Sequence, residues 1–380
     1  MRTLMVASLA MILLASSGAA QGALSTQGLG YPTGQISARA EGMGGAIADF
    51  DPLSLTSPSS IAGVGAAALF FQYSPEFRRV TAGSSTANTT TARFPLVSGI
   101  LPMGQDWTLG LSASTFLDRS SETSLQRRVQ AGDPIAADSV NMTEQNKVLG
   151  GIDDVRLALG WSGSSKFHIG VGAHAFSGSN RITLARIFPD TSTFTSTTQS
   201  GRLSYAGFAA SLGIEFRPVH AIGFAIAGRK GGNLKAQSGD TAIGSARIPD
   251  HYSASVSFDG ITGANLSARV AHDSWSSLSS IASSGIQAFD GWDYSVGAEA
   301  SGPRILSRLI VLRAGGRRRT LPFGFSGEKV SETSFMGGLG VPLAANRAGF
   351  DFSLQHASRS AVGNISERAF ILSFGLRVTP

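Results

Sequence analysis

Residues 154–161 read Asp-Val-Arg-Leu-Ala-Leu-Gly-Trp, and residues 167–174 read Phe-His-Ile-Gly-Val-Gly-Ala-His. In both stretches an apolar side chain occupies every second position, and a short Gly-Ser-Ser turn at residues 163–165 lies between them. A period of two predicts a β-strand with one apolar face, and two such strands joined by a tight turn predict a hairpin. We therefore expect a fold built from antiparallel hairpins.

The same alternation continues to the last predicted strand, where the apolar residues are Phe370, Leu372, Phe374, Leu376 and Val378. Short turns alternate with longer polar loops, which are expected at 119–147, 179–199, 229–246 and 274–289. This asymmetry is typical of outer-membrane barrels, in which the short turns face the periplasm. The predicted strands are 64–82, 88–102, 106–118, 148–162, 166–178, 200–216, 219–228, 247–258, 263–273, 290–301, 307–319, 331–343, 348–358 and 367–378.

A soluble β-sandwich is the alternative, because its strands alternate too. However, the second face of these strands carries Gly, Ser and isolated charges, whereas a sandwich has an apolar inner face. A membrane-spanning sheet must also close, so that its last strand pairs with its first and no edge remains. The sequence therefore predicts an all-β fold, a transmembrane antiparallel β-barrel of about 14 strands.

The N-terminus has the features of a secretory signal: Arg2, an apolar run from Leu4 to Leu14 and small residues from Ala15 to Ala20. The run is shorter than the roughly 20 residues that a spanning helix needs, although an uncleaved anchor is the alternative. We expect residues 1–20 to be a signal peptide, cut after Ala20 or near Gly22. The mature chain would then cross the inner membrane to the outer membrane of a Gram-negative bacterium.

Composition excludes several classes of function. The chain has no cysteine, which excludes disulfides and thiolate metal or redox sites. Its formal net charge of +6 comes from scattered basic residues, which suits lipid phosphates better than nucleic acid. His168 and His174 share one strand face, but six strand residues separate them by about 20 Å, too far for joint catalysis. We predict no catalytic residue, no cofactor, no metal site and no enzymatic activity.

Residues 21–63 alternate little and precede the barrel domain, 64–380. They contain Gly42-Met43-Gly44-Gly45-Ala46, Asp49-Phe50-Asp51-Pro52 and Ser57-Pro58-Ser59. The segment is too long for a linker, and a wide barrel leaves a lumen that such a segment can fill. We expect a lumenal plug, with a loose periplasmic tail as the alternative.

Several short blocks, in order along the mature chain, resemble FadL/TodX-type outer-membrane transporters of hydrophobic compounds. They are residues 42–46 followed by 49–63, residues 248–253, Trp275-Ser276, residues 312–315 running into 321–323, and residues 337–343. The resemblance implies a hatch formed by Gly42, Gly44, Gly45, Ser57, Pro58 and Ser59. It also implies passive, porin-like uptake of a small hydrophobic compound such as a long-chain fatty acid.

One position departs from that family. The hatch usually carries Asn-Pro-Ala, and the matching residues here are Ser57, Pro58 and Ser59. The proline turn is kept and the Asn amide is lost, which favours the wider barrel superfamily over fatty-acid transporters in particular. That group includes PorV-like barrels, which implies a second hypothesis, a scaffold or cargo-binding barrel with a protein partner at its extracellular loops.

Charged and aromatic residues on the lumen phase are candidates for a pathway or a ligand contact. Arg313 is the best candidate for a ligand carboxylate, because an Ala-Gly pair follows it; the alternative is an internal ion-pair network that braces the wall. The run Arg317-Arg318-Arg319 is expected at the upper end of its strand, facing lipopolysaccharide phosphates or forming a solvated loop cluster. The lumen candidates are Phe116, Arg156, Phe176, Arg269, Glu299 and Arg313.

Overall fold

The computed structural model describes residues 19–20, 24, 28–33, 35–83, 85–131, 138–189, 194–281, 287–305, 308–324, 327–344, 347–360 and 365–379. The predicted signal peptide lies outside these ranges except for Ala19 and Ala20, which form the short strand β1 beside β6. No helix among the described residues has the length and apolar character needed to cross a membrane.

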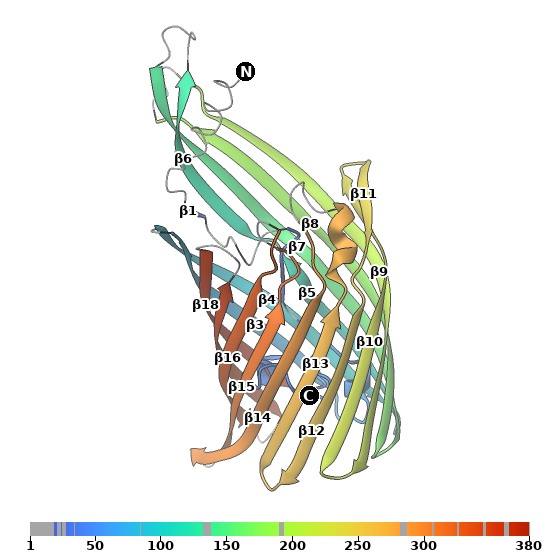
Figure 1. Ribbon diagram of the computed structural model, residues 1–380. Helices are drawn as coiled ribbons and strands as arrows, with labels where there is room; N and C mark the ends of the chain where they lie inside the picture. The colour runs from blue at the N-terminus through green and yellow to red at the C-terminus, as the bar shows by residue number, and fades with distance from the viewer. Residues whose placement is uncertain are drawn as a thin grey trace.

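The chain forms a closed antiparallel barrel of 14 strands (Figure 1). The last strand, β18, pairs with the first wall strand, β3, through partners from Val378 with Leu69 to Ile365 with Ala82. Closure removes the sheet edges and excludes the sandwich alternative. The wall strands are β3 (Ala68–Ala82), β4 (Ser85–Met103), β5 (Trp107–Asp118), β7 (Asp138–Ser164), β8 (Phe167–Ile187), β9 (Thr197–Val219), β10 (Ile222–Ser238), β12 (His251–Ile261), β13 (Ala264–Asp273), β14 (Gly291–Ile305), β15 (Arg308–Thr320), β16 (Ser331–Leu343), β17 (Ala348–Ser360) and β18 (Ile365–Val378).

All fourteen predicted strands are present, and the short turns lie at the rim where β18 ends. The predicted long loops at 119–147, 179–199 and 229–246 were wrong in large part, because strands continue through them. β6 (Ser121–Ala131) pairs with the upper part of β7, β8 pairs with β9 up to Arg186 and Thr197, and β11 (Thr241–Arg247) pairs with β10. These hairpins rise above the wall, where both faces meet water, so no apolar alternation marks them.

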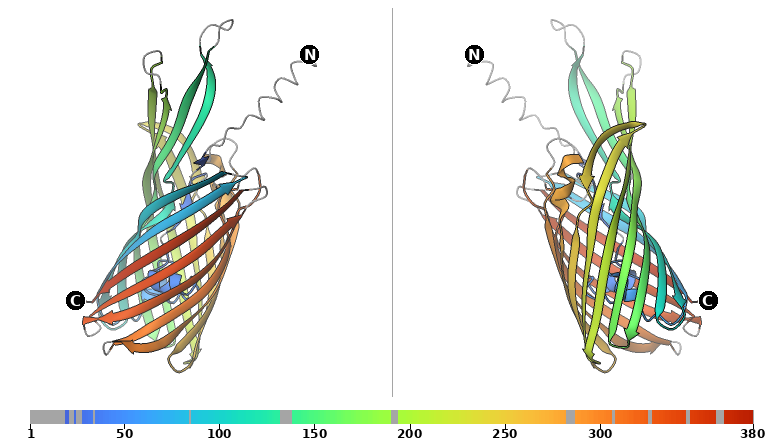
Figure 2. Two further views of the ribbon diagram at one scale, coloured as in Figure 1. Left: turned by 90° about the vertical axis from the view of Figure 1, so that its left-hand side faces the viewer. Right: turned by 90° about the vertical axis from the view of Figure 1, so that its right-hand side faces the viewer.

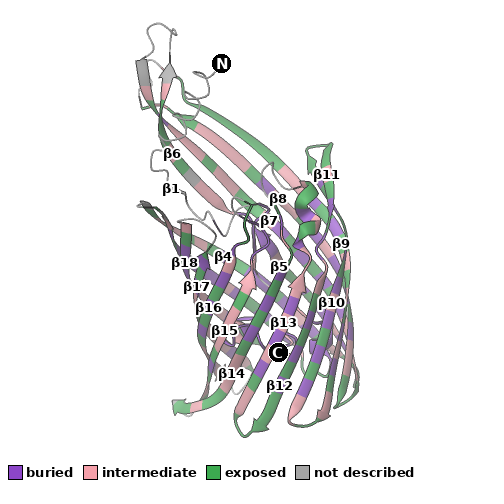
Figure 3. Ribbon diagram, in the orientation of Figure 1, coloured by how far each residue is buried: buried purple, intermediate pink, exposed green. Residues whose placement is uncertain are grey.

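Exposed residues alternate with more buried ones along the wall strands (Figure 3). In β7, Val155 and Leu157 are exposed on the outer face, while Asp154 and Arg156 are buried inside. An apolar outer face suits the acyl chains of a bilayer, and the polar inner face must find its partners within the lumen.

The N-terminal segment supplies many of those partners, because it lies inside the barrel in the views of Figure 2. It contains the short helix α2 (Ala38–Gly42), the 3-10 turn η1 (Pro58–Ile61) and the two-residue strand β2 (Tyr31–Pro32), which pairs with β5. The Ser37 side chain caps α2 by accepting a hydrogen bond from the Ala40 N–H.

Glycines of the wall make room for this segment. A Cβ on Gly170 would lie 2.2 Å from the Pro58 carbonyl oxygen, and one on Gly315 would lie 2.2 Å from the Met43 carbonyl carbon. Both distances are far below van der Waals contact, so any larger residue at these positions would displace the segment. The inward-facing glycines therefore form the seats on which η1 and the turn after α2 rest.

Candidate functional site

The N-terminal segment is tied to the wall by ion pairs. Asp49 accepts hydrogen bonds from Arg269 at 3.0 Å and from Ser255 at 2.5 Å, and Arg39 pairs with Glu299 at 2.9 Å. Burial is the largest single effect and raises the pKa of Asp49, but the Arg269 guanidinium, the Ser255 hydroxyl and weaker contributions together lower that pKa below its ordinary value. Each of the two ion pairs joins a charge of the segment to an opposite charge of a wall strand.

The predicted lumen residues Glu299 and Arg313 lie next to this junction. Arg313 donates to Glu299 and to Asp351, both at 2.6 Å. Its guanidinium is thus bound on two sides by carboxylates of β14 and β17. The structure places Arg313 in an internal ion-pair network, the alternative weighed for it, and not beside an open ligand space.

The predicted hatch residues face the same wall. A Cβ on Gly42 would meet Arg313 and the backbone of Gly338, and one on Gly44 would lie 2.8 Å from the Gly316 carbonyl oxygen. Gly44 and Gly45 also have positive φ values of 70° and 86°, which other residues rarely adopt. Gly44 is therefore required both by the backbone turn and by its closeness to the wall, whereas Gly45 is required by the turn and Gly42 by the wall.

The segment Ser57-Pro58-Ser59 is fully enclosed. The Ser57 and Ser59 hydroxyls lie 2.8 Å apart, and Ser60 donates to the Ser57 carbonyl at 2.8 Å. Serine hydroxyls thus satisfy this buried turn locally, in the position where the resembling family carries an Asn amide.

A second group of charges surrounds Tyr31, and we call it the Tyr31 cluster. The Tyr31 hydroxyl donates to Glu332 at 2.8 Å and accepts from Arg319 and from Arg359. Arg359 is fully buried and also binds Glu76 and Glu367. Guanidinium groups lie over the ring as well, at 4.6 Å for Arg359 and 4.8 Å for Arg319. The cluster consists of Tyr31, Glu76, Arg93, Arg319, Glu332, Arg359 and Glu367.

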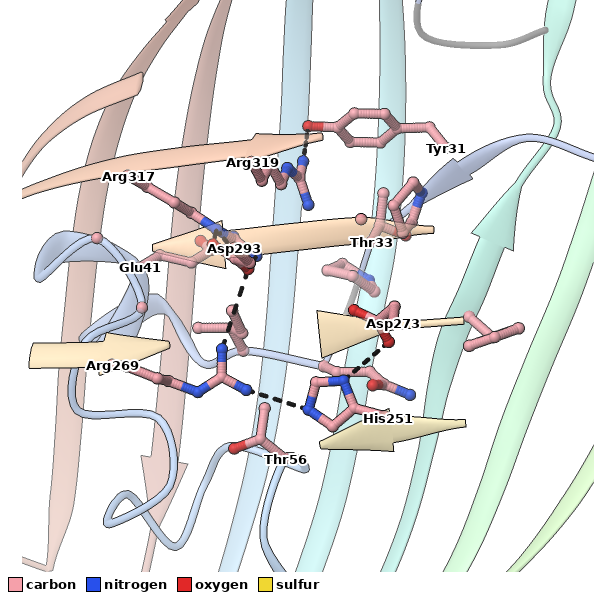
Figure 4. Close-up of a pocket in the computed structure, with 18 of the residues that line it drawn as sticks. Tyr31, Thr33, Glu41, Thr56, His251, Arg269, Asp273, Asp293, Arg317 and Arg319 are labelled. Atoms are coloured by element: carbon pink, nitrogen blue, oxygen red, sulfur yellow. Dashed lines mark hydrogen bonds and ion pairs between the residues drawn. The ribbon is translucent and has the colours of Figure 1, made fainter. Parts of the chain in front are cut away.

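A cavity of about 120 Å³ lies between the Tyr31 ring and the part of the N-terminal segment that contains Glu41 and Thr56 (Figure 4). On one side Arg269 donates to His251 Nε2 at 3.2 Å, and His251 Nδ1 lies 2.8 Å from Asp273. Because a guanidinium can only donate, Nε2 is the acceptor in this contact, and Nδ1 is then the atom that donates to Asp273. Arg317 pairs with Asp293 at 2.5 Å on the neighbouring strand.

The opposite side of the cavity is aromatic. Phe116 stacks on Trp275 with ring centroids 5.3 Å apart and meets Phe176 edge-on at 4.9 Å. Trp275 comes from the 3-10 helix η2 (Trp275–Ile281), which follows β13. The Arg229 guanidinium lies 5.0 Å from the Phe116 ring and 5.6 Å from the Phe176 ring. We call these four residues the Arg229 cluster.

Arg229 differs from the other arginines of the cavity. It is 5 % exposed, it donates only a long hydrogen bond of 3.4 Å to the Gln35 side-chain oxygen, and its Nε has no partner. Among the described residues, no carboxylate lies within 4.0 Å of its guanidinium. Within the described part of the chain, Arg229 therefore carries a buried positive charge that has no carboxylate at ion-pair distance.

The remaining acid of the cavity is Glu41. Burial raises the pKa of Glu41 to about 7, against hydrogen bonds from Ser373 and Ser353 and the charge of Arg317, which lower it. A partly neutral Glu41 leaves the cavity with an excess of positive charge. Its charged lining residues are Glu41, Arg93, Arg229, Arg269, Asp273, Asp293, Arg317 and Arg319.

Three residues of adjacent strands form a hydrogen-bonded chain that resembles a hydrolase triad. His174 lies 2.9 Å from Asp154 through Nδ1 and 2.9 Å from Ser211 through Nε2. However, Ser211 is in mid-strand, opposite Gly172 of β8 and Arg229 of β10. The backbone N–H groups around it belong to the sheet ladders and form no oxyanion hole. These three hydrogen-bonded side chains therefore stabilise the wall from inside the barrel.

The arginines predicted on β7 and β15 point into the lumen, with one exception. Arg156 points inward and donates to the Leu55 carbonyl at 2.9 Å, which ties β7 to the N-terminal segment. Arg317 and Arg319 also point inward, to Asp293 and Glu332, so they do not face lipopolysaccharide as expected. Only Arg318 of that run is on the exposed outer face, because neighbours in a strand point to opposite sides.

The sequence pattern did not predict three of the lumen residues, Arg229, Tyr31 and Trp275, of which Trp275 is the aromatic neighbour of Phe116. Arg229 follows the predicted end of its strand at residue 228, since Gly231-Gly232 looked like a loop. The structure has a register shift there, between Gly231 and Leu234, and the strand continues. A glycine pair flanked by alternating residues is the signal of such a bulge.

No protein-family model matches the chain, and no curated protein matches its sequence. Solved structures match its fold. A FadL homologue of Pseudomonas aeruginosa is 12% identical, with a TM-score of 0.63 over 92% of this chain and 99% of that one. The toluene transporter TbuX of Ralstonia pickettii is 12% identical, with a TM-score of 0.57 over 91% and 98%. The toluene transporter TodX of Pseudomonas putida is 12% identical, with a TM-score of 0.55 over 93% and 98%. The chain therefore has the fold of the FadL/TodX-type barrels that its sequence resembles.

Proposed function

We propose that this barrel takes up a small amphipathic molecule passively across the outer membrane, and that the molecule joins an apolar chain or ring to a carboxylate. A long-chain fatty acid belongs to this class. The transporters that share the fold support the broader part of the proposal, uptake of a hydrophobic compound. The observation that carries the finer part is the unpaired charge of Arg229.

A buried guanidinium without a counter-ion is costly, because it has left water and gained no opposite charge. The other arginines that line the cavity, Arg93, Arg269, Arg317 and Arg319, each have a carboxylate within 4.0 Å, as Arg269 has in Asp49. Arg229 has only aromatic faces and one long hydrogen bond. A ligand carboxylate would supply the missing partner through a charge-assisted, bidentate contact.

The rest of the Arg229 cluster suits the apolar part of the same ligand. Phe116 and Trp275 line the cavity beside Arg229, so an anionic head on the guanidinium leaves its chain against aromatic faces. Pockets of this kind are mostly apolar with a few polar groups that fix orientation. Below the cavity, α2 and η1 must shift before the ligand can leave, and no energy source is implied.

Uptake into liposomes tests the proposal. Liposomes with the barrel would receive a fluorescent fatty acid or the matched fatty alcohol, which has the same chain and no charge. We expect the barrel to accelerate entry of the acid, and Arg229→Met to reduce that rate about tenfold with little effect on the alcohol. A tenfold change corresponds to about 1.4 kcal/mol, within the range of a hydrogen bond to a charged group.

The control is Arg202→Met, which removes an exposed arginine of β9 from the extension above the wall. It should leave both rates unchanged. If the wild-type barrel accelerates neither compound, uptake is disproved as a function. If Arg229→Met slows acid and alcohol equally, uptake stands and the carboxylate contact does not.

The tall hairpins favour a second candidate function, the scaffold or cargo-binding role. β6, the upper part of β7 and β11 project above the wall, and most of their described side chains are exposed or half-buried, many of them polar (Figure 1). Such a surface suits a protein partner at the cell surface better than a lipid. Shortening β6 and its partner in β7 should leave fatty-acid uptake intact and abolish display of the partner, if this role is correct.

A further inference from the structure

The outer wall carries three arginines near the upper ends of β15, β18 and β3. Arg318, Arg368 and Arg79 are exposed, while the residues next to Arg368 and Arg79 in sequence are buried inside. Among the described residues, no carboxylate lies within 4.0 Å of any of these three guanidinium groups. These positive charges therefore face the surroundings of the barrel, in contrast to the paired arginines of the lumen.

Strand register places the three arginines in one tier around the wall. Arg368 is the direct cross-strand partner of Arg79. Arg318 is opposite Thr333, which is opposite Ser358, which in turn is opposite Arg368. Adjacent strands are about 4.8 Å apart, so Arg318 lies roughly 14 Å from the pair. Like charges directly opposite each other destabilise a sheet, which indicates that an anion belongs between Arg79 and Arg368.

The tiers above and below show what kind of molecule carries that anion. One step toward the middle of the wall, Phe335, His356, Phe370 and Phe77 are successive cross-strand partners. Phe335, Phe370 and Phe77 are exposed by 69%, 51% and 46%. An exposed aromatic belt marks the level where acyl chains meet head groups. The arginines lie just above that level, where lipid phosphates are found.

One step nearer the rim, every position of the tier carries a hydroxyl group. Because a hydroxyl both donates and accepts, such a tier suits the sugar part of a glycolipid. None of the described residues in the aromatic, arginine and hydroxyl tiers carries a carboxylate. The successive cross-strand partners of the hydroxyl tier are Thr320, Ser331, Ser360, Ser366, Thr81 and Thr86.

An apolar groove opens on the outer wall beside Arg318. It has a volume of about 660 Å³ and a floor of small residues that includes Ala254, Ala268 and Gly316, with Phe335 at one end. The groove begins at the arginine tier and extends into the aromatic tier. An acyl chain in it would keep its phosphate at the level of Arg318.

We infer that this face, formed by β15 to β18, β3 and β4 and turned toward the viewer on the left of Figure 2, binds a phosphorylated glycolipid of the outer leaflet. Arg79 and Arg368 hold one phosphate in common, and Arg318 holds a second. The hydroxyl tier contacts the sugars, and an acyl chain lies in the groove, which extends from β15 and β16 over the neighbouring strands β14, β13, β12 and β10. The inference concerns the outer wall and does not depend on what passes through the lumen.

Binding of purified lipid A, the phosphorylated glycolipid anchor of lipopolysaccharide, tests this site on the delipidated full-length barrel in detergent. We expect the double variant R79Q/R368Q to bind it at least tenfold more weakly than wild type, and R318Q about threefold more weakly. The control R304Q/R308Q removes two exposed arginines at the opposite rim and should bind normally. Lipid A without its phosphates should bind wild type at least tenfold more weakly.

The melting temperature provides a second readout. R368Q alone should raise it in lipid-free detergent, because the repulsion with Arg79 is relieved, and should reduce the rise that lipid A causes in wild type. If R79Q/R368Q fails to fold, R79K/R368K keeps both charges and should bind within threefold of wild type. Equal binding by R79Q/R368Q, equal binding of dephosphorylated lipid, or competition by inorganic phosphate at lipid concentrations would overturn the inference.

Discussion

Residues of the Tyr31 cluster and of the Arg229 cluster line the same cavity, yet the two clusters differ in whether a buried arginine has carboxylate partners. In the first, Arg359 is fully buried and contacts Glu76, Glu332 and Glu367. In the second, Arg229 is almost as buried, and its neighbours are the rings of Phe116 and Phe176. One cluster is complete without a ligand, and the other is not.

This difference separates bracing from binding within one lumen. A buried charge that already has carboxylate partners gains little from a ligand, since a new anion would have to displace an existing pair. A buried charge without a partner gains the whole interaction. The number of carboxylates around each arginine therefore indicates its role better than its position in the lumen does.

The largest expected effect comes from breaking the Tyr31 cluster. Arg359→Ala leaves three carboxylates in a buried site without their common partner, which should lower the free energy of unfolding by about 3–5 kcal/mol. Urea unfolding of the barrel in phospholipid vesicles measures this. The control Arg202→Ala removes an exposed arginine of β9 above the wall and should change stability by less than about 0.5 kcal/mol. A loss below about 1 kcal/mol for Arg359→Ala would mean that the cluster does not brace the wall.

Breaking the contact between the N-terminal segment and the wall should have an intermediate effect on stability. Asp49→Asn removes the charge that Arg269 pairs with and keeps an acceptor of similar size, so about 1.5–3 kcal/mol of local stability should be lost. Hydrogen exchange of residues 38–61 should speed up while the wall strands stay protected. Asp259→Asn at the lower rim is the matched control. Uniform exchange in variant and wild type would show that this pair does not hold the segment.

The wall strands could be predicted from the sequence because the bilayer requires their outer face to be apolar. Each wall strand must present apolar residues at every second position, as β7 does with Val155 and Leu157. Where strands rise into water the rule ends, and β6 and β11 were taken for loops. The backbone hydrogen bonds that extend those hairpins leave no trace in side-chain polarity.

The site could be predicted only in part, for a different reason. Arg313 and Arg229 look alike in sequence, because each is next to a pair of small residues, Ala314-Gly315 after Arg313 and Ala227-Gly228 before Arg229. What distinguishes them is their partners, Glu299 and Asp351 for Arg313. Those partners are 14 and 38 residues away and depend on strand register. For Arg229 the bulge at Gly231 also concealed the strand, so its lumenal position could not be read from the pattern.

Glu41 should make the stability of the folded protein depend on pH. Its pKa is raised from 4.5 to about 7, so between these values the folded protein binds more protons than the unfolded chain. Stability should therefore fall as pH rises from about 4.5 to 7, by about 1–2 kcal/mol after allowing for partial exposure. The melting temperature should fall over this range more in wild type than in Glu41→Gln. Parallel curves for the two proteins would contradict the assignment.

The smallest expected change in stability is also the one that separates the two clusters most sharply. Arg229→Met removes a cation–π contact worth up to about 2 kcal/mol and at the same time the cost of an unpaired buried charge. These effects oppose each other, so we expect the free energy of unfolding to change by less than about 1 kcal/mol. Binding of a fatty acid, followed by fluorescence of Trp275, should nevertheless be lost, while binding of the matched alcohol persists. If Arg229→Met instead destabilises the barrel as much as Arg359→Ala does, Arg229 has a structural role like that of Arg359, and its charge is not the binding site for a ligand carboxylate.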